Sequence, residues 1–120
     1  MPSKVKSKKF LWKAIQDGDM EMLQFYLTNN PDVYIKTFSL NRYGWNALHA
    51  ACYFGHSHLV QYLVEVHHMD VNLSNSNGWH SLIFAAISRS DDVVQYLVEK
   101  TGVDPFKRDA KGYSALCYAR

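Results

Sequence analysis

Apolar residues in the middle of the chain follow a pattern that repeats every 34 positions. Val60-Gln-Tyr-Leu-Val-Glu65 recurs without change as Val94-Gln-Tyr-Leu-Val-Glu99. Each copy places apolar residues at i, i+1, i+4 and i+5, starting at Leu59 and at Val93, which is the spacing of one face of an amphipathic helix. An identity of six residues in one register predicts a repeat protein.

A shorter helix is predicted ahead of each amphipathic helix. In the best-defined copy it covers about 47–54, and Asn46 is a suitable N-cap. Gly44, with polar residues ahead of it, has the chemistry of a tight turn, which recurs at Gly78 and Gly112. The sequence therefore predicts an all-α solenoid of helix-turn-helix units joined by hairpin-like tips.

The signals that start and stop these helices differ between copies. Asn46 and Ser114 are residue types that cap helices, whereas His80 at the same position is a poorer cap. Gly102 is suited to a left-handed stop after the second helix. His68 stands at the equivalent position, so we expect a modest left-handed strain there.

The repeat register divides the chain into one domain with a tail. Residues 1–7 are predicted to be a flexible basic tail and 8–120 the repeat domain, divided into a capping unit at 8–40, units at 41–74 and 75–108, and a partial unit at 109–120. The first unit is degenerate, which suits a cap because one end of a stack must face water. The last unit reaches Arg120 only a turn and a half into its first helix. We therefore expect an open apolar face that meets a partner, another copy or the rest of a longer array.

The unit at 41–74 contains a recognisable motif. It begins Asn41-Arg-Tyr-Gly-Trp-Asn-Ala-Leu48 and continues His49-Ala-Ala-Cys-Tyr-Phe-Gly-His56. This run resembles the ankyrin repeat, a unit of about 33 residues with a Thr-Pro-Leu-His-x-Ala core. The resemblance extends from about Lys9 to Arg120, although Thr-Pro is absent throughout. It implies a non-catalytic module for protein–protein interaction.

Ankyrin-like proteins typically bind partners through a concave face made of the hairpin tips and the exposed surface of the first helices. Carried over position by position, the resemblance implies a partner-binding set of Arg42, Tyr43, Trp45, Tyr53, Phe54, Asn77, Trp79, Ile87, Ser88, Lys111 and Tyr113. Several are of the types that dominate interface hot spots. For Trp45, Trp79 and Tyr113 the alternative is internal stacking, tip on tip. Tyr53 and Phe54 favour binding, because other residues already supply the buried face of their helix.

Composition and charge narrow the class of protein. The chain is 48% hydrophobic and 20% charged, as in ordinary globular domains, and has no apolar run of membrane-spanning length. Its net charge of +2 includes Lys4, Lys6, Lys8 and Lys9 in the first nine residues. This lysine stretch is interpreted as solubilising, so nucleic-acid binding and membrane contact are disfavoured. With no secretory-type apolar stretch, we expect a cytoplasmic protein, with nuclear entry left open, and reduced, buried cysteines at positions 52 and 117.

Catalytic and metal-binding motifs are absent from the sequence. It has no Gly-rich phosphate loop, nucleophile elbow or His-Glu-x-x-His. The histidines at 56, 58, 67 and 68 are not joined by a cysteine or carboxylate cluster, so a metal site is disfavoured. We predict no enzyme activity, no cofactor and no small-molecule substrate. The partner is a protein of unknown identity, with self-association through the open face as a further prediction. The alternative function is a regulatory or targeting segment of a larger enzyme or channel.

Overall fold

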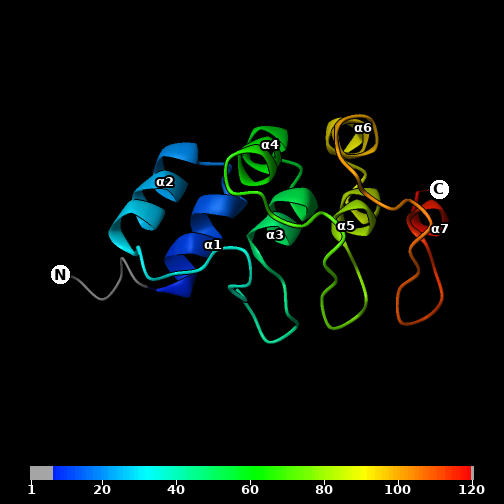
Figure 1. The fold of residues 1–120 in the computed structure, drawn as a ribbon, viewed down its shortest axis with the longest axis horizontal. Helices are drawn as coiled ribbons and strands as arrows, with labels where there is room; N and C mark the ends of the chain where they lie inside the picture. Colours follow the sequence, from blue (N-terminus) through cyan, green and yellow to red (C-terminus); the bar gives the residue numbers. More distant parts are fainter. Residues whose placement is uncertain (1–6, 120) are drawn as a thin grey trace.

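The computed structural model describes residues 7–119, and over that range the chain forms helices and turns without a strand. The helices are α1 (Lys8–Gln16), α2 (Met20–Asn29), α3 (Ala47–Tyr53), α4 (Ser57–Glu65), α5 (Ser81–Ile87), α6 (Asp91–Lys100) and α7 (Ala115–Tyr118). They form an elongated stack of 45 × 26 × 21 Å (Figure 1). The predicted all-α solenoid is confirmed. Of the predicted tail, only Ser7 is described, and it is the N-cap of α1; the rest lies outside the described residues.

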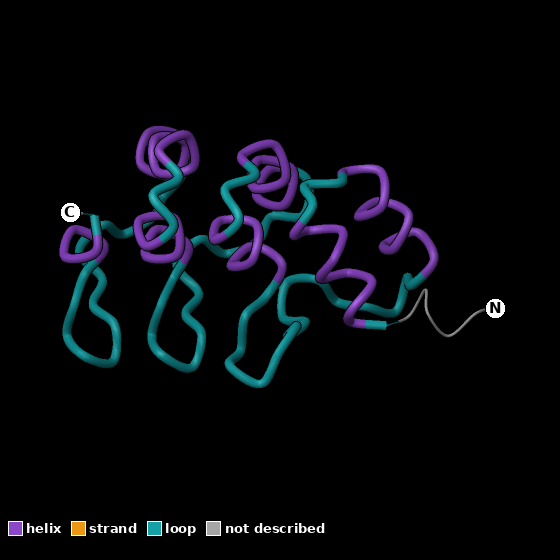
Figure 2. The backbone as a smooth tube through the Cα atoms, turned by 180° about the vertical axis from the view of Figure 1, so that it is seen from behind, coloured by secondary structure: helices purple, strands orange, loops and turns teal. Residues whose placement is uncertain are grey.

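The helices lie in two layers (Figures 1 and 2). The inner layer holds α1, α3, α5 and α7, each in contact with the next, and the outer layer holds α2, α4 and α6. Long hairpin loops ahead of α3, α5 and α7 project from the inner layer on the side away from the outer helices. We use "concave face" for the surface formed by the inner helices and these hairpins.

Small residues allow the inner helices to pack closely. Ala50, Ala51 and Cys52 are completely buried in α3, and Ala85 is completely buried in α5. A larger side chain at these positions would hold neighbouring backbones apart, because protein interiors are packed at the density of organic crystals. Cys52 is buried as expected, and burial raises the pKa of its thiol. Cys117 is exposed, which contradicts the expectation, because no described element packs beyond α7.

Helix starts follow the repeat register more closely than they follow the capping side chains. Asn46 caps α3 as predicted, and its side-chain oxygen accepts from the His49 backbone N–H at 2.9 Å. His80 and Ser114 make no side-chain cap, yet α5 and α7 begin at the positions equivalent to the start of α3. The prediction for Ser114 is wrong: its hydroxyl lies 3.9 Å from the sulfur of Cys117 instead.

Within residues 7–119, left-handed backbone occurs at two non-glycine residues. His68 has φ 55°, as its position predicts, and Arg89 has φ 58° at the place where the preceding unit has Gly55. The prediction for Gly102 is wrong, since it does not have positive φ. Helix α6 ends at an extended Thr101 instead, whose hydroxyl donates to the Leu97 carbonyl and so satisfies one of the helix's terminal acceptors.

Candidate binding surface

Each hairpin tip is shaped by one side chain. The Asn41 side-chain oxygen accepts from the backbone N–H of Tyr43 at 3.0 Å and of Trp45 at 3.1 Å. The same two bonds recur from Asn75 and from the Asp109 carboxylate in the next tips. Because this Asx arrangement satisfies the turn's own donors, the residues at the tip keep their side chains free for solvent or a partner.

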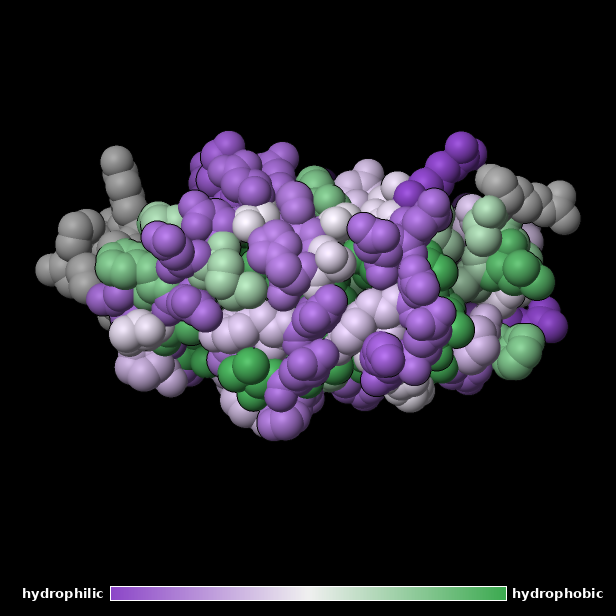
Figure 3. Space-filling view, turned by 90° about the horizontal axis from the view of Figure 1, so that it is seen from above, coloured by the Kyte–Doolittle hydropathy of each residue, from purple (hydrophilic) through white to green (hydrophobic). Residues whose placement is uncertain are grey.

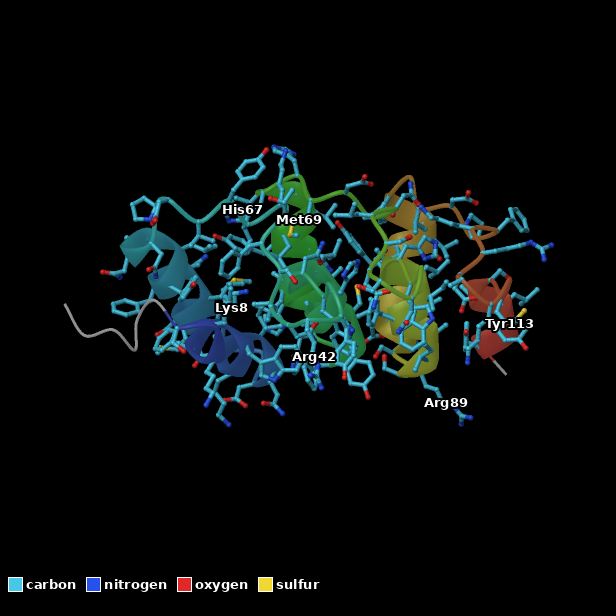
Figure 4. The ribbon with its side chains drawn as sticks, turned by 90° about the horizontal axis from the view of Figure 1, so that it is seen from below. Lys8, Arg42, His67, Met69, Arg89 and Tyr113 are labelled. Atoms are coloured by element: carbon cyan, nitrogen blue, oxygen red, sulfur yellow. The ribbon has the colours of Figure 1, made fainter. Side chains whose placement is uncertain are left out.

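The tips are also bonded to one another. The Ser76 N–H donates to the Tyr43 carbonyl at 3.0 Å, and the Ala110 N–H donates to the Asn77 carbonyl at 2.9 Å. Arg42, Tyr43, Asn77, Lys111 and Tyr113, all in the predicted set, have exposed side chains on this bonded framework. Figure 4, which looks at the hairpin side, labels Arg42 in the hairpin ahead of α3 and Tyr113 in the hairpin ahead of α7.

Two buried histidines form hydrogen bonds to the loop ahead of the next inner helix. The Nδ1 atom of His49 accepts from the Asn46 N–H at 3.1 Å, and Nε2 donates to the Leu73 carbonyl at 2.8 Å. His80 repeats the second bond, to Asp104 at 2.7 Å. Burial, together with the nearby His80, lowers the pKa of His49 to about 4, so the ring is neutral at pH 7. His49 therefore has a structural role in the network of turn hydrogen bonds.

Three residues of the predicted set meet in an aromatic cluster that we define as Trp12, Trp45, Tyr53 and Phe54. Ring centroids are 5.8 Å apart for Trp12 and Trp45, 5.5 Å for Trp12 and Phe54, and 5.1 Å for Trp45 and Tyr53. Tyr53 is 37% exposed, and the other three are half-buried. Trp12 was missed by the sequence analysis. Aligning Leu11 with Leu48 puts Trp12 in the register of His49, which is buried in the second unit, so the register gave no signal that Trp12 lies on this face.

The two hairpin tryptophans do not stack directly in any described ring contact. The ring of Phe84, which is completely buried, lies 4.6 Å from Trp45 and 5.5 Å from Trp79 and joins them. The indole of Trp79 also donates to the Asp109 carboxylate at 3.1 Å. Both tryptophans thus pack internally while remaining half-exposed, and their role toward a partner stays a prediction.

The remaining predicted positions of the third unit are less prominent. Ile87 and Ser88 are half-buried at the end of α5. The Ser88 hydroxyl lies 3.2 Å from the Cys52 carbonyl and 2.8 Å from the Ser90 hydroxyl, so its polar atom is engaged within the stack. The concave face is therefore most aromatic where the first two units meet.

A basic groove adjoins the aromatic cluster. Its volume is about 500 Å³, and it is lined by Lys8, Lys9, Trp12, Lys13, Leu40 and Asn41. The Lys8 ammonium lies 5.2 Å from the centroid of the Phe38 ring, and Lys13 forms an exposed ion pair with Asp17 at 3.4 Å. We call the groove lined by Lys8, Lys9, Trp12, Lys13, Leu40 and Asn41 the lysine groove.

The C-terminal end of the stack carries an apolar hollow of about 230 Å³. It is lined by Leu82, Ala86, Val94, Val98, Pro105, Phe106, Ala115, Leu116 and Ala119. Phe106 is 79% exposed and Leu116 is 75% exposed. Hydrophobic surface shows at this end in the view from the outer-helix side, where hydrophilic residues otherwise predominate (Figure 3).

The surface histidines connect units. The Nε2 atoms of His56 and His58 donate to the Gln16 and Gly18 carbonyls at 2.8 and 2.9 Å, which ties the second unit to the first. Among residues 7–119 no group of three or more His, Cys, Asp or Glu side chains is arranged to hold a metal ion. No helix in that range is both long and apolar enough to cross a membrane.

Comparison with known proteins identifies the repeats. The family model described as "Ankyrin repeats (3 copies)" matches residues 11–109. Two curated relatives, the Notch-regulated ankyrin repeat-containing proteins of Xenopus tropicalis and Xenopus laevis, are each 35% identical over 54 residues, which is 45% of this chain. The chain matches only 44% of the length of each relative.

A solved structure is similar over most of the stack. A chain in the crystal structure of the yeast ribosomal protein Rps3 in complex with its chaperone Yar1 superposes with a TM-score of 0.81 and 27% identity. The match covers 93% of this chain and 81% of that one.

Proposed function

Because the chain belongs to the ankyrin repeat family, we propose that it is a non-catalytic module that binds a protein partner through its concave face. Ankyrin repeats act as protein–protein interaction modules, and the similar solved structure comes from a complex of a chaperone with a ribosomal protein. Fold alone does not choose a partner, so the proposal rests on the surface itself.

The observation that carries the proposal is the aromatic cluster beside the bonded hairpin tips. Tyr53 is 37% exposed and Tyr43 is 50% exposed, on a framework held by Asx turns and tip-to-tip hydrogen bonds. Trp, Tyr and Arg side chains contribute most of the binding energy at protein interfaces. A surface held in one conformation before binding loses little entropy on association.

The test is affinity capture with paired variants. Tyr53→Ala combined with Phe54→Ala should weaken retention of the partner at least about tenfold, because hot-spot truncations cost about 2 kcal/mol or more. Met22→Ala combined with Phe25→Ala is the matched control, since these side chains are 37% and 47% exposed and lie on the outer helix α2. Equal retention by both double variants, with both folded by circular dichroism, would refute the placement.

Self-association through the C-terminal hollow is a second candidate, favoured by the exposure of Phe106 and Leu116. Contiguous apolar surface of this kind marks interaction sites on many proteins. Sedimentation velocity should then show a concentration-dependent dimer that Leu116→Glu abolishes. A monomer at all concentrations accessible to the measurement would exclude this candidate and leave the first unaffected.

A further inference from the structure

Charged side chains are segregated between the two layers of the stack. The outer helices α2, α4 and α6 carry five acidic residues, Glu21, Glu65, Asp91, Asp92 and Glu99, and one base, Lys100. The inner helices α1, α3, α5 and α7 carry three lysines and no acidic residue. The net charge of the chain hides this difference between the two sides.

The hairpins extend the basic side. The hairpins ahead of α3 and α7 carry the exposed bases Arg42, Arg108 and Lys111. The acidic residue within these tips, Asp109, is 7% exposed, and its carboxylate accepts from the Trp79 indole, the Tyr118 hydroxyl and two backbone N–H groups. Its charge is therefore engaged inside the tip. Two exposed acidic residues, Asp32 and Asp104, lie earlier in the same loops, ahead of the tips. A segment lying across the concave face would meet exposed positive charge at the tips and at α1.

The lysines of α1 occupy a position that helix electrostatics disfavours. Lys8 and Lys9 are exposed in its first turn, which contains no acidic residue. The positive end of the helix dipole favours acidic side chains there, as at Asp91 and Asp92 in α6. Positive charge at the start of α1 therefore does not serve the helix, which points to a role outside it.

The lysine groove and the aromatic cluster share one side chain. Trp12 lines the groove and lies 5.8 Å from Trp45 and 5.5 Å from Phe54, centroid to centroid. Figure 4 shows Lys8 on α1 and Arg42 in the neighbouring hairpin, on the same view of the hairpin side. Basic and aromatic surface are thus continuous where the first two units meet.

We propose that the partner segment bound by the concave face is an acidic peptide stretch with apolar or aromatic anchors. This inference rests on the proposed function and names the chemistry of its ligand. The anchors pack on Trp45, Tyr53 and Phe54, and the Asp or Glu side chains lie toward the lysine groove. Complementary charge of this kind speeds association and rejects basic competitors.

The test uses peptides selected against the whole chain. A displayed library of random peptides of about 14 residues suits the surface, because an extended chain covers about 3.3 Å per residue and the stack is 45 Å long. The selected peptides, labelled with fluorescein, are titrated by anisotropy against wild-type protein and variants. We expect an excess of Asp and Glu in them, together with Trp, Phe or Leu.

Two lysines provide a matched pair of variants. Lys9→Glu and Lys100→Glu change the net charge equally at exposed positions, one at the lysine groove and one at the end of α6. Lys9→Glu should weaken peptide binding about threefold, and Lys8→Glu with Lys9→Glu about tenfold, with a smaller difference in high salt. Lys100→Glu should leave the affinity unchanged.

The outcomes separate this inference from the proposed function. Neutral or basic peptides that still require Tyr53 and Phe54 would overturn the acidic partner and leave the proposed function standing. Equal weakening by Lys9→Glu and Lys100→Glu would also overturn it. If no selected peptide depends on Tyr53 and Phe54, the proposed function fails, and this inference fails with it. Tighter binding of a single-stranded oligonucleotide, or of vesicles containing phosphatidylserine, would assign the lysine groove to a different ligand.

Discussion

Acidification should destabilise the stack well before its carboxylates are protonated, because His49 must remain neutral in the folded state. Its ring is 1% exposed, and both of its nitrogens are used: Nδ1 accepts from Asn46, and Nε2 donates to Leu73. A proton on Nδ1 would remove the acceptor for the Asn46 backbone N–H and place a charge in the core. Both effects favour the unfolded state.

The size of the effect follows from the pKa of His49, which burial lowers from 6.5 to about 4. The folded pKa of His49 lies below its unfolded pKa. The contribution of the neutral His49 ring to the stability of the fold is therefore complete above pH 6.5 and is lost as the pH falls toward 4. A shift of this size corresponds to a loss of about 3 kcal/mol, at 1.36 kcal/mol per pKa unit. The pKa of His80 is lowered mainly by burial, which acts in the same direction.

Urea unfolding at a series of pH values between 7 and 4 measures this loss. The control is His49→Gln, whose side-chain amide has a donor and an acceptor but does not titrate in this range. The variant should be less stable than wild type at pH 7. Its free energy of unfolding should also depend less steeply on pH, because its unfolding takes up as much as one proton fewer. If the two proteins have parallel pH dependence, the account of His49 is wrong.

Further predictions concern the hairpin tips and α1. Gly78→Ala should destabilise the fold more than Gly112→Ala. Both positions have positive φ, which costs a residue with a Cβ about 1–2 kcal/mol. Only at Gly78 would the added Cβ also meet the next tip, at 2.8 Å from the Ala110 nitrogen. Equal losses of stability for the two variants in thermal unfolding would contradict this. Asn75→Asp should raise the free energy of unfolding at pH 7 by about 1 kcal/mol. It replaces a buried Nδ2 that has no partner with an oxygen that can accept from the Trp45 indole, as Asp109 accepts from Trp79. Urea titration would show no gain if that indole cannot reach. Lys9→Glu should stabilise α1 by about 0.5 kcal/mol while it weakens peptide binding, and parallel changes in stability and affinity would refute the separation of these roles.

Much of the fold could be predicted because repetition in sequence becomes repetition in space. The turn at Gly44 fixed the register of Gly78 and Gly112, and all three have the positive φ that a tight tip requires. The failures occur where context differs between units. Gly102 follows a helix whose Thr101 already satisfies a terminal carbonyl, and Cys117 lies on a helix that no described element covers.

The candidate site was less predictable because it depends on relations between units. The repeat register placed Trp45 and Tyr53 on one face. Trp12 could not be placed in the same way, because it comes from the degenerate first unit, which has no recognisable turn ahead of its first helix. The role of Phe84 as the ring between two tryptophans is also invisible in the sequence, because the equivalent residue of the second unit is Ala50. Charge segregation requires knowing which helices form the inner layer. Composition gives only the sum, +2.

Packing and binding can be separated at the aromatic cluster because its members differ in what supports them. Trp45 rests on the buried Phe84, so replacing it removes core contacts together with any partner contact. Tyr53 follows the last fully buried residue of α3 and has its ring contacts with other surface aromatics, Trp45 and Phe54. Truncating Tyr53 therefore removes exposed aromatic surface while the Phe84 support remains. A loss of affinity without a loss of stability is the result that distinguishes a binding residue from a packing residue on this face.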